Sequence, residues 1–250
     1  MQTLTEPTLP LVSICTPTRD RLGFLPLLLR CIQQQTYPQS KIEWVVVDDG
    51  VDSSESICTQ FANTRFVRLD PADDRIPLGC KRNLSHLAAQ GEILLYMDDD
   101  DYYPPCRVAH AVKRLLGTPN RLIAGSSILP IHFTDRGETW MVGPYGPNHA
   151  TAATFAFRRE LLEETAYDEQ AKSAEEYHFL KGYTIPMVQL ESTRTILAFS
   201  HAGNTYDKRQ LLRDPTQKKR IRRAAWPLSK FIADRELRAE YLAAATRLDG

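Results

Sequence analysis

Three short apolar segments that each run directly into a polar cluster constrain the fold of this chain most. Each segment is aliphatic or β-branched and short enough for a buried strand. The segments, each with the polar residues that follow it, are Leu11–Cys15 before Thr16–Arg21, Ile42–Val47 before Asp48–Gly50, and Ile93–Met97 before Asp98–Asp101.

Helical patterns separate these predicted strands. Apolar residues recur at helical spacing from Phe24 to Gln35 and from Leu78 to Gln90. Alternation of strands and helices predicts a parallel sheet with helices on its faces. In such sheets ligands bind beyond the carboxyl ends of the strands. We therefore expect the three polar clusters to share one crevice.

The four consecutive carboxylates of Asp98–Asp101 indicate the chemistry of that crevice. Carboxylates this close together repel one another unless a cation lies among them. Mg2+ or Mn2+ suits oxygen ligands and is often shared with a substrate phosphate. The alternative is a solvated acidic turn before a helix that begins near Pro104 and Pro105. Convergence of three polar clusters on one edge favours the metal–phosphate interpretation.

Composition and charge narrow the class of protein. A chain of 250 residues, 42% hydrophobic and 25% charged, fits one large globular domain, or one domain with a helical extension. Lys plus Arg and Asp plus Glu both number 31, so no overall basic field exists for nucleic acid, and no nucleic-acid partner is expected. Basic residues gather locally from Lys208 to Arg238.

The sequence also predicts a cytoplasmic protein. Residues Met1–Pro10 lack the charged and apolar regions of a signal peptide, and no apolar run has the length of a membrane helix. The odd number and scattered spacing of the cysteines predict reduced thiols, most of them packing residues. They are Cys15, Cys31, Cys58, Cys80 and Cys106.

The strand-end motifs resemble those of the family 2 glycosyltransferases, over roughly residues 10–205. The matching motifs are Ser13–Arg21, Val45–Gly50, Gly79–Asn83, Tyr96–Asp101 with Pro105, and Glu175–Tyr177. The resemblance implies a GT-A fold: a mixed, mainly parallel central sheet flanked by helices. It also implies an inverting, metal-dependent enzyme that uses a nucleotide sugar. The segments Pro77–Asn83 and Asp98–Pro104 look closest to a viral and bacterial polysaccharide subset that includes rhamnosyltransferases.

This resemblance sets the expected domain boundaries. Residues 10–207 would form the GT-A domain, after an N-terminal extension of residues 1–9 and before a C-terminal helical extension of residues 208–250. The chain departs from the family pattern twice. Arg19-Asp20 stands where the family usually has Tyr-Asn, so a guanidinium replaces an aromatic base contact. Glu176 stands where the family has Asp, and its side chain is one methylene longer.

The resemblance also implies where the donor binds. Asp49 would accept a hydrogen bond from a base imide N–H, which favours a UDP-linked sugar, and Asp48 would hold the loop. Asp98 or Asp99 would hold the ribose. The full set of implied donor-binding residues is Thr16, Pro17, Thr18, Arg19, Arg21, Asp49, Lys81, Arg82, Asp98, Asp99, Lys208 and Arg209.

By the same resemblance, Asp100 is the main ligand of Mn2+ or Mg2+, and His201 is a second ligand. Glu176 would be the general base that takes the proton of the acceptor hydroxyl, with Glu175 as the fallback. The alternative for Glu175 and Glu176 is a pair of ordinary exposed helix acids. For a lone histidine such as His201, a structural hydrogen bond is the alternative.

Local geometry adds two expectations, and the resemblance, which aligns Pro105 with the family's proline, adds a third for Asp101. Neighbouring helix positions point about 100° apart, so Lys81 and Arg82 should not both face inward. If strand geometry persists, Asp98 and Asp100 share one face and Asp99 takes the other. Asp101 is expected to cap the following turn.

The remaining segments are less specific. Trp140 and Tyr145 lie where the fold builds its acceptor wall, although both suit a core equally well. Residues Pro215–Leu248 are expected to form long helices that pack an apolar stripe against the main domain. The stripe comprises Leu228, Phe231, Ile232, Leu237, Tyr241 and Leu242. The basic residues Lys218–Arg223 are either solvated or in peripheral contact with a membrane that carries a lipid-linked acceptor.

Two other function classes remain open at this stage. A nucleotidyltransferase that makes sugar nucleotides also uses acids and a metal, but it usually has a Gly-rich loop after the first strand, which Thr16–Asp20 lacks. A non-catalytic nucleotide-sugar or glycan binder would keep the crevice without a base. The leading hypothesis is a glycosyltransferase of hexosyl type that transfers a sugar to a hydroxyl of a glycan, a lipid or another acceptor.

Overall fold

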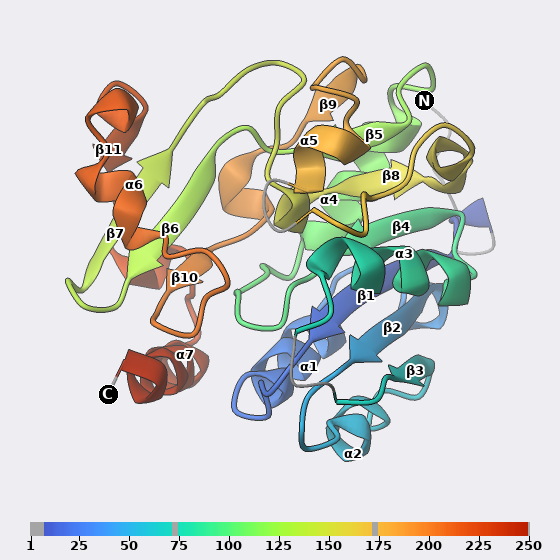
Figure 1. The fold of residues 1–250 in the computed structure, drawn as a ribbon, viewed down its shortest axis with the longest axis horizontal. Coiled ribbons are helices and arrows are strands. Elements are labelled where there is room, and N and C mark those ends of the chain that lie inside the picture. Colours follow the sequence, from blue (N-terminus) through green and yellow to red (C-terminus); the bar gives the residue numbers. More distant parts are fainter. Residues whose placement is uncertain (1–7, 72–74, 172–174, 250) are drawn as a thin grey trace.

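A computed structural model describes residues 8–71, 75–171 and 175–249. The main sheet has the strand order β3-β2-β1-β4-β8-β5-β9 (Figure 1). All neighbours in it pair in parallel except β8, which is antiparallel to both β4 and β5. Its strands are β1 (Val12–Thr18), β2 (Ile42–Asp48), β3 (Thr64–Arg68), β4 (Ile93–Tyr96), β5 (Ile123–Gly125), β8 (Ala156–Arg158) and β9 (Met187–Gln189).

A smaller second sheet has the order β10-β6-β7-β11 and lies beside the main sheet (Figure 1). Its strands are β6 (Leu129–Phe133), β7 (Glu138–Val142), β10 (Ala198–Ser200) and β11 (Ile221–Arg223). Strand β10 pairs with β6 in parallel, whereas β7 is antiparallel to both β6 and β11.

Helices cover the main sheet, and a helix forms the C-terminal end of the described chain. The α-helices are α1 (Leu25–Gln33), α2 (Glu55–Cys58), α3 (Leu78–Ala88), α4 (Arg107–Leu116), α5 (Glu175–Phe179), α6 (Arg209–Arg213) and α7 (Arg235–Asp249). The 3-10 helices are η2 (Gln39–Lys41), η3 (Ala152–Thr154), η4 (Arg159–Glu163), η5 (Ser192–Arg194), η6 (Pro215–Gln217) and η7 (Leu228–Lys230).

The main sheet separates two hydrophobic layers. Every residue of β1, β2 and β4 is buried, as expected for parallel strands covered on both faces. Successive side chains point to opposite faces, so Trp44 joins the layer that contains α1 and Val45 joins the other layer. The predicted α/β architecture is therefore confirmed, and it brings the ends of β1, β2 and β4 to one edge.

The C-terminal part of the chain is less helical than expected. The prediction of a helix is wrong for Pro215–Arg223, which forms η6 and the edge strand β11. The backbone groups of β11 pair with β7, and this tertiary pairing outweighs the local sequence preference. Only the end of the apolar run Thr195–Phe199 is extended, since β10 begins at Ala198, after η5.

The final helix agrees with the prediction. Helix α7 lies beside α1 (Figure 1), and Ile232, Leu237 and Tyr241 of the predicted apolar stripe are buried. The other stripe residues, Leu228, Phe231 and Leu242, are partly buried against the same core. The boundaries at residues 9 and 207 stay predictions, and residues 1–7 of the expected N-terminal extension lie outside the described residues.

Two further expectations concern thiols and membranes. All five cysteines are free thiols, and Cys15, Cys31 and Cys58 are buried. Among the helices of the described chain, none combines the length and apolar character that crossing a bilayer requires.

Candidate active site

The carboxyl ends of β1 and β4 are joined by hydroxyl groups. Thr16 is fully buried, and its hydroxyl donates to the carbonyl of Met97 at 2.7 Å and accepts from the indole of Trp44 at 2.9 Å. Thr18 donates to the carboxylate of Asp99 at 2.6 Å. Thr16 and Thr18 lie within strand β1 and not in the loop after it. Their hydrogen bonds connect the end of β1 to the residues that follow β4, and so help to hold the acidic turn, Asp98–Asp101, in place.

At the end of β2, the two adjacent carboxylates have different partners. Asp48 accepts hydrogen bonds from the backbone N–H of Gly50 at 2.8 Å and of Ser54 at 2.9 Å, so it holds the loop. Asp49 is buried and pairs with Lys81 at 2.7 Å and with Arg19 at 3.2 Å. Burial acts to raise the pKa of Asp49, but Lys81 and Arg19 outweigh it and hold that pKa below its ordinary value.

Lys81 and Arg82 are both buried, so the expectation that only one of them faces inward is wrong. Helix α3 packs over β1, between the ends of β2 and β4. Because the two side chains leave the helix about 100° apart, they reach opposite neighbours of β1. Lys81 contacts Asp49 beyond β2, and Arg82 contacts Asp98 beyond β4 at 3.2 Å.

Arg82 links the acidic turn to the start of α5. Its guanidinium lies 4.3 Å from the centroid of the Tyr96 ring and 3.9 Å from the carboxylate of Glu175. Within the described residues, its Nε and Nη1 have no hydrogen-bond partner although the side chain is 1% exposed. Buried N–H groups without a partner are costly, so these two groups suit an anionic ligand in the adjacent cavity.

The acidic run does not keep strand geometry. Strand β4 ends at Tyr96, so the expected alternation of Asp98 and Asp100 against Asp99 is wrong. The carboxylate of Asp101 is buried and accepts from the backbone N–H of Phe199 in β10 at 3.0 Å. Asp101 therefore ties the turn to the second sheet instead of capping the next turn.

Asp100 and His201 converge from the two sheets. Their Oδ2 and Nε2 atoms are 3.3 Å apart, and Asn204 donates to the same Oδ2 at 3.1 Å. Arg21 lies 3.9 Å from both Asp99 and Asp100. No group of three metal-binding side chains occurs among residues 8–71, 75–171 and 175–249. A carboxylate beside an imidazole nevertheless fits a divalent ion that a diphosphate would also ligate.

The pKa values of Asp99 and Asp100 are shifted in opposite directions. Burial and then the charge of Asp100 raise the pKa of Asp99 to about 7. Burial opposes ionisation of Asp100 as well, but His201, Lys208 and Arg21 hold its pKa well below the ordinary value. Asp100 thus ionises more readily than Asp99.

Lys208 and Arg209 take different positions. Lys208 donates to the carbonyl of Phe199 at 2.9 Å and lies near Asp100. The guanidinium of Arg209 instead pairs with Asp207 at 2.7 Å, and Arg209 is not among the residues that line the cavity beside the acidic turn. Lys208 is therefore the cation of this pair that faces the cavity.

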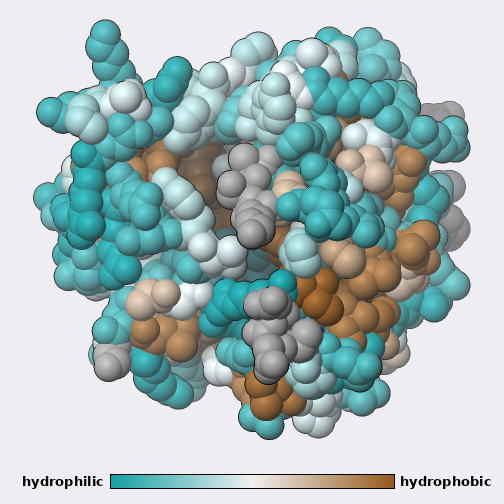
Figure 2. All heavy atoms as spheres, in the orientation of Figure 1, coloured by the Kyte–Doolittle hydropathy of each residue, from teal (hydrophilic) through white to brown (hydrophobic). Residues whose placement is uncertain are grey.

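A cavity of about 160 Å3 brings the acidic turn and α5 together. In Figure 2 the molecule is hollowed between the part that carries the second sheet and the part that carries α5, with hydrophobic residues at the bottom of the hollow. The polar side chains that line the cavity are those of Arg82, Asp98, Asp100, Asp101, Thr151, Glu175, Glu176, Asn204, Thr205, Tyr206 and Lys208. Asn204 and Tyr206 were not singled out from the sequence, since no spacing pattern marks them.

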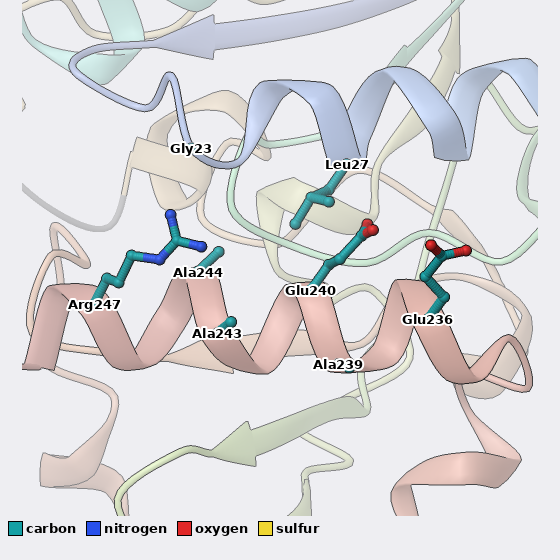
Figure 3. Close-up of a pocket in the computed structure, with 8 residues that line it drawn as sticks. All are labelled: Gly23, Leu27, Glu236, Ala239, Glu240, Ala243, Ala244 and Arg247. Atoms are coloured by element: carbon teal, nitrogen blue, oxygen red, sulfur yellow. The ribbon is translucent and has the colours of Figure 1, made fainter.

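A second hollow, of about 390 Å3, lies between α1 and α7 (Figure 3). Its lining comprises Gly23, Leu27, Glu236, Ala239, Glu240, Ala243, Ala244 and Arg247. None of the strand-end residues contributes to it, so the smaller cavity is the candidate active site despite its size.

Glu175 and Glu176 at the start of α5 are not equivalent. The carboxylate of Glu175 lies 3.9 Å from the guanidinium of Arg82. Burial, and then the negative charge of Glu175, raise the pKa of Glu176 above its ordinary value. Both side chains line the cavity, and a carboxylate of raised pKa in such a place is suited to accept a proton.

Comparison with known proteins agrees with this arrangement. The family model described as glycosyl transferase family 2 matches residues 13–165, more than half of the chain. The chain belongs to glycosyl transferase family 2. The match contains all of β1 except Val12, together with β2, β4 and the acidic turn, so the family resemblance of the motifs at these strand ends is confirmed. The motif Glu175–Tyr177 lies outside the match.

The curated relatives share limited sequence identity with this chain. The glycosyltransferase AglE of Haloferax volcanii is 30% identical over 122 residues, which cover 48% of this chain and 40% of AglE. The chain thus spans less than half the length of this curated relative.

Solved structures confirm the GT-A fold. TarS of S. aureus in complex with UDP-GlcNAc gives a TM-score of 0.60 at 21% identity, covering 78% of this chain and 60% of that one. The mannosyltransferase PcManGT of Pyrobaculum calidifontis in complex with GDP-Man and Mn2+ gives a TM-score of 0.61 at 18% identity. That match covers 96% of this chain and 74% of the mannosyltransferase. Both neighbours are GT-A glycosyltransferases.

Proposed function

We propose that this protein is an inverting glycosyltransferase that moves a sugar from a UDP-linked donor to a hydroxyl group of a glycan or lipid-linked acceptor. The observation that carries the proposal is the shared cavity, which Asp98, Asp100 and Glu176 all line. Family membership and the nucleotide sugars named with TarS and PcManGT support a nucleotide-sugar donor.

The nucleotide would lie along the ends of β1, β2 and β4. Asp49 would accept a hydrogen bond from the imide N–H of uracil, because its carboxylate is kept ionised by Lys81 and Arg19. Asp98 or Asp99 would hold the ribose. The partnerless buried N–H groups of Arg82 would bind the diphosphate or the sugar that follows it.

Asp100 and His201 would hold Mn2+ or Mg2+, with Lys208 close by. Asp100 lines the cavity, and its Oδ2 lies 3.3 Å from Nε2 of the buried His201 behind it. The Mn2+ complex of PcManGT supports such a site by analogy. A bound divalent ion would neutralise negative charge on the departing diphosphate. Lys208 and Arg21 would add permanent positive charge near the same point.

The transfer itself would be a single displacement. Glu176 would take the proton of the acceptor hydroxyl while the acceptor oxygen forms a bond to the anomeric carbon of the sugar. The bond from that carbon to the diphosphate oxygen would break on the opposite face, so the nucleoside diphosphate leaves with the bonding electron pair. Attack opposite the leaving group inverts the anomeric configuration.

The two alternative classes differ from this proposal in their products. A nucleotidyltransferase would release pyrophosphate while forming a sugar nucleotide, and a non-catalytic binder would release nothing. The family match, which covers the donor motifs, favours the transferase over both. A peripheral membrane contact through Lys218–Arg223 and a cytoplasmic location remain expectations from the sequence alone.

A donor panel tests the proposal. Uridine, guanosine and thymidine diphosphate sugars are added with Mn2+, and the unfolding temperature is recorded, because a ligand bound only by the folded state raises it. The donor that stabilises most is then incubated with a set of glycan acceptors. We expect release of the nucleoside diphosphate that depends on the acceptor. Pyrophosphate release, or stabilisation without any turnover, would contradict the proposal.

A further inference from the structure

Four aromatic rings form a continuous row beside the active-site cavity. Tyr177 of α5 lies 5.6 Å from Tyr183, whose ring is 4.4 Å from His149, which is 4.7 Å from Tyr145. The last two contacts have interplanar angles near 30°, at 31° and 33°. Tyr177 is 50% exposed, and the other three rings are half-buried. The row therefore runs from a solvent-exposed ring, Tyr177, to rings that also pack against the hydrophobic core, among them Tyr183 and Tyr145.

Both ends of this aromatic row lie near residues that line the cavity. Tyr177 directly follows Glu176, and the charge of Glu176, after burial, contributes to raising the pKa of Tyr183 to about 12. At the other end, burial raises the pKa of Tyr145, and Tyr206, which lines the cavity, is among the neighbours that act on it. A molecule that lies along the row can thus present a hydroxyl group near Glu176.

The row is held in place before any ligand binds. The side chain of Gln189 donates to the carbonyls of Pro147 at 2.8 Å and of His149 at 3.2 Å, which fixes the loop that carries His149. Tyr183 has a φ of 62°, a backbone conformation that bulky residues rarely adopt. Such a conformation persists only where the surrounding structure fixes it. Rings that are already ordered lose little entropy when they bind a ligand.

Positive charge adjoins the row. The guanidinium of Arg220 lies 5.5 Å from the centroid of the Tyr145 ring. Arg220 belongs to the basic segment Lys218–Arg223, whose five basic side chains are all exposed. One of them, Arg223, pairs with Glu138 at 3.2 Å. The segment includes β11, so hydrogen bonds to β7 fix its position at the end of the row.

We propose that the aromatic row and the basic segment form an acceptor subsite for an acidic oligosaccharide, one that carries carboxylate or phosphate groups. Aromatic faces pack against the apolar faces of sugar rings, and arginine binds carboxylate and phosphate groups through paired hydrogen bonds. This inference rests on the proposed transferase function and adds the chemical class of the acceptor. A neutral glycan would use the rings without the adjacent charge.

Titration with defined oligosaccharides tests the subsite. The full chain, saturated with UDP and Mn2+, is titrated with a hexamer of galacturonic acid and with a neutral glucose hexamer of equal length. We expect the acidic hexamer to bind about tenfold more tightly, and the difference to shrink as salt is added. Equal affinity for the two hexamers, or no binding of the acidic one, would overturn the proposal.

Variants identify the surface involved. Tyr183→Ala should weaken binding of the acidic hexamer about 3- to 10-fold, whereas Tyr183→Phe, which keeps the ring, should not. Arg220→Gln should weaken the acidic hexamer and leave the neutral one unchanged. Lys113→Gln, which removes an exposed charge from α4, is the matched control and should change neither. Unchanged binding in both Tyr183→Ala and Arg220→Gln would contradict the assignment.

Two further arms separate this inference from its alternatives. Stabilisation by UDP and Mn2+ should persist in every variant. If UDP and Mn2+ do not stabilise the intact protein, the proposed function itself is contradicted, and not the subsite alone. Vesicles with anionic phosphatidylglycerol and an oligothymidylate are tested in parallel. If the vesicles or the oligothymidylate bind more tightly than the acidic hexamer, and Arg220→Gln abolishes that binding, the oligosaccharide assignment is overturned.

Discussion

The regions proposed to bind the nucleotide and the acceptor are built from different interactions. On the nucleotide side, at the ends of β1, β2 and β4, buried ion pairs such as Asp49–Lys81 at 2.7 Å and Asp98–Arg82 at 3.2 Å fix the side chains. On the acceptor side, at α5 and the loops near it, ring contacts such as Tyr183–His149 at 4.4 Å dominate.

This difference matches what each side is proposed to bind. A diphosphate and a base offer charges and directed hydrogen bonds, which fixed ions recognise well. A sugar chain offers apolar ring faces that stacking accommodates in several registers. Substitutions on the nucleotide side should therefore abolish binding or turnover, and those on the acceptor side should change acceptor choice by smaller factors.

The largest effect is expected from Asp100→Asn. This change removes the ionised carboxylate that faces His201, and with it the proposed metal site. Metal ions contribute several kcal/mol to such reactions, so transfer should fall about 10³-fold or more. Nucleoside diphosphate release at saturating Mn2+ measures this, with circular dichroism as the check on folding. Wild-type turnover in the variant, or undiminished turnover of the intact protein with a chelator, would contradict the metal assignment.

Glu176→Gln should slow the chemical step by about 10²- to 10⁴-fold, because the amide cannot accept the acceptor proton. Donor affinity should hardly change, since Glu176 lies in α5 and not at the strand ends. Single-turnover rates and donor titrations separate the two effects. Glu175→Gln is the matched control, and a dead Glu175→Gln beside an active Glu176→Gln would assign the base to Glu175.

Asp49→Asn tests recognition of the base. Hydrogen bonds to charged groups are worth about 1.5–3 kcal/mol, so donor affinity should fall roughly 10- to 100-fold. Asp52→Asn, an exposed change in the following loop, should leave affinity unchanged. Calorimetry with UDP and ADP measures both, and the intact protein should prefer UDP. If the intact protein bound UDP and ADP with equal affinity, Asp49 would not be recognising the imide N–H of uracil.

A pH profile should show a smaller effect. Glu176 acts only when ionised, so the rate falls as pH drops through its pKa, which Glu175 helps to raise. Removing that charge in Glu175→Gln lowers the pKa of Glu176. The acidic limb of the rate profile should therefore move to lower pH. A limb that stays in place or moves to higher pH would remove Glu175 as the group that sets the pKa of Glu176.

The smallest effect concerns support from the C-terminal helix. The hydroxyl of Tyr241 donates to the carbonyl of Asp101 at 3.1 Å, behind the acidic turn. Tyr241→Phe should lower the free energy of unfolding by about 1 kcal/mol, as measured by urea denaturation. Tyr177→Phe, at a half-exposed ring of the acceptor side, should change it by under about 0.5 kcal/mol. If the two variants lost equal free energy of unfolding, the hydrogen bond from Tyr241 to Asp101 would not be a specific support of the acidic turn.

The same division explains how far the sequence could predict the site. The strands and α3 follow from local periodicity, and the donor motifs lie at their ends, so one edge of the sheet gathers Asp49, Asp98 and Asp100. Burial of both Lys81 and Arg82 was not predictable from helix geometry alone, because it depends on α3 lying between two acidic strand ends.

The acceptor side is harder to predict. Tyr145 and Tyr183 meet through His149, and no periodic pattern connects the three positions. The edge strand β11 was expected to be helical because its basic residues carry no strand signal, and only pairing with β7 makes it extended. Asp101 likewise finds its partner in β10, almost a hundred positions later.

The central claim is a single displacement across the cavity, from the nucleotide side to a base on the acceptor side. NMR of the product tests it most directly, because the coupling constant of the anomeric proton reports the configuration of the new bond. We expect an anomer opposite to that of the donor, so a donor with an α-linked sugar should give a β-linked product. A product that retains the configuration of the donor would contradict the account.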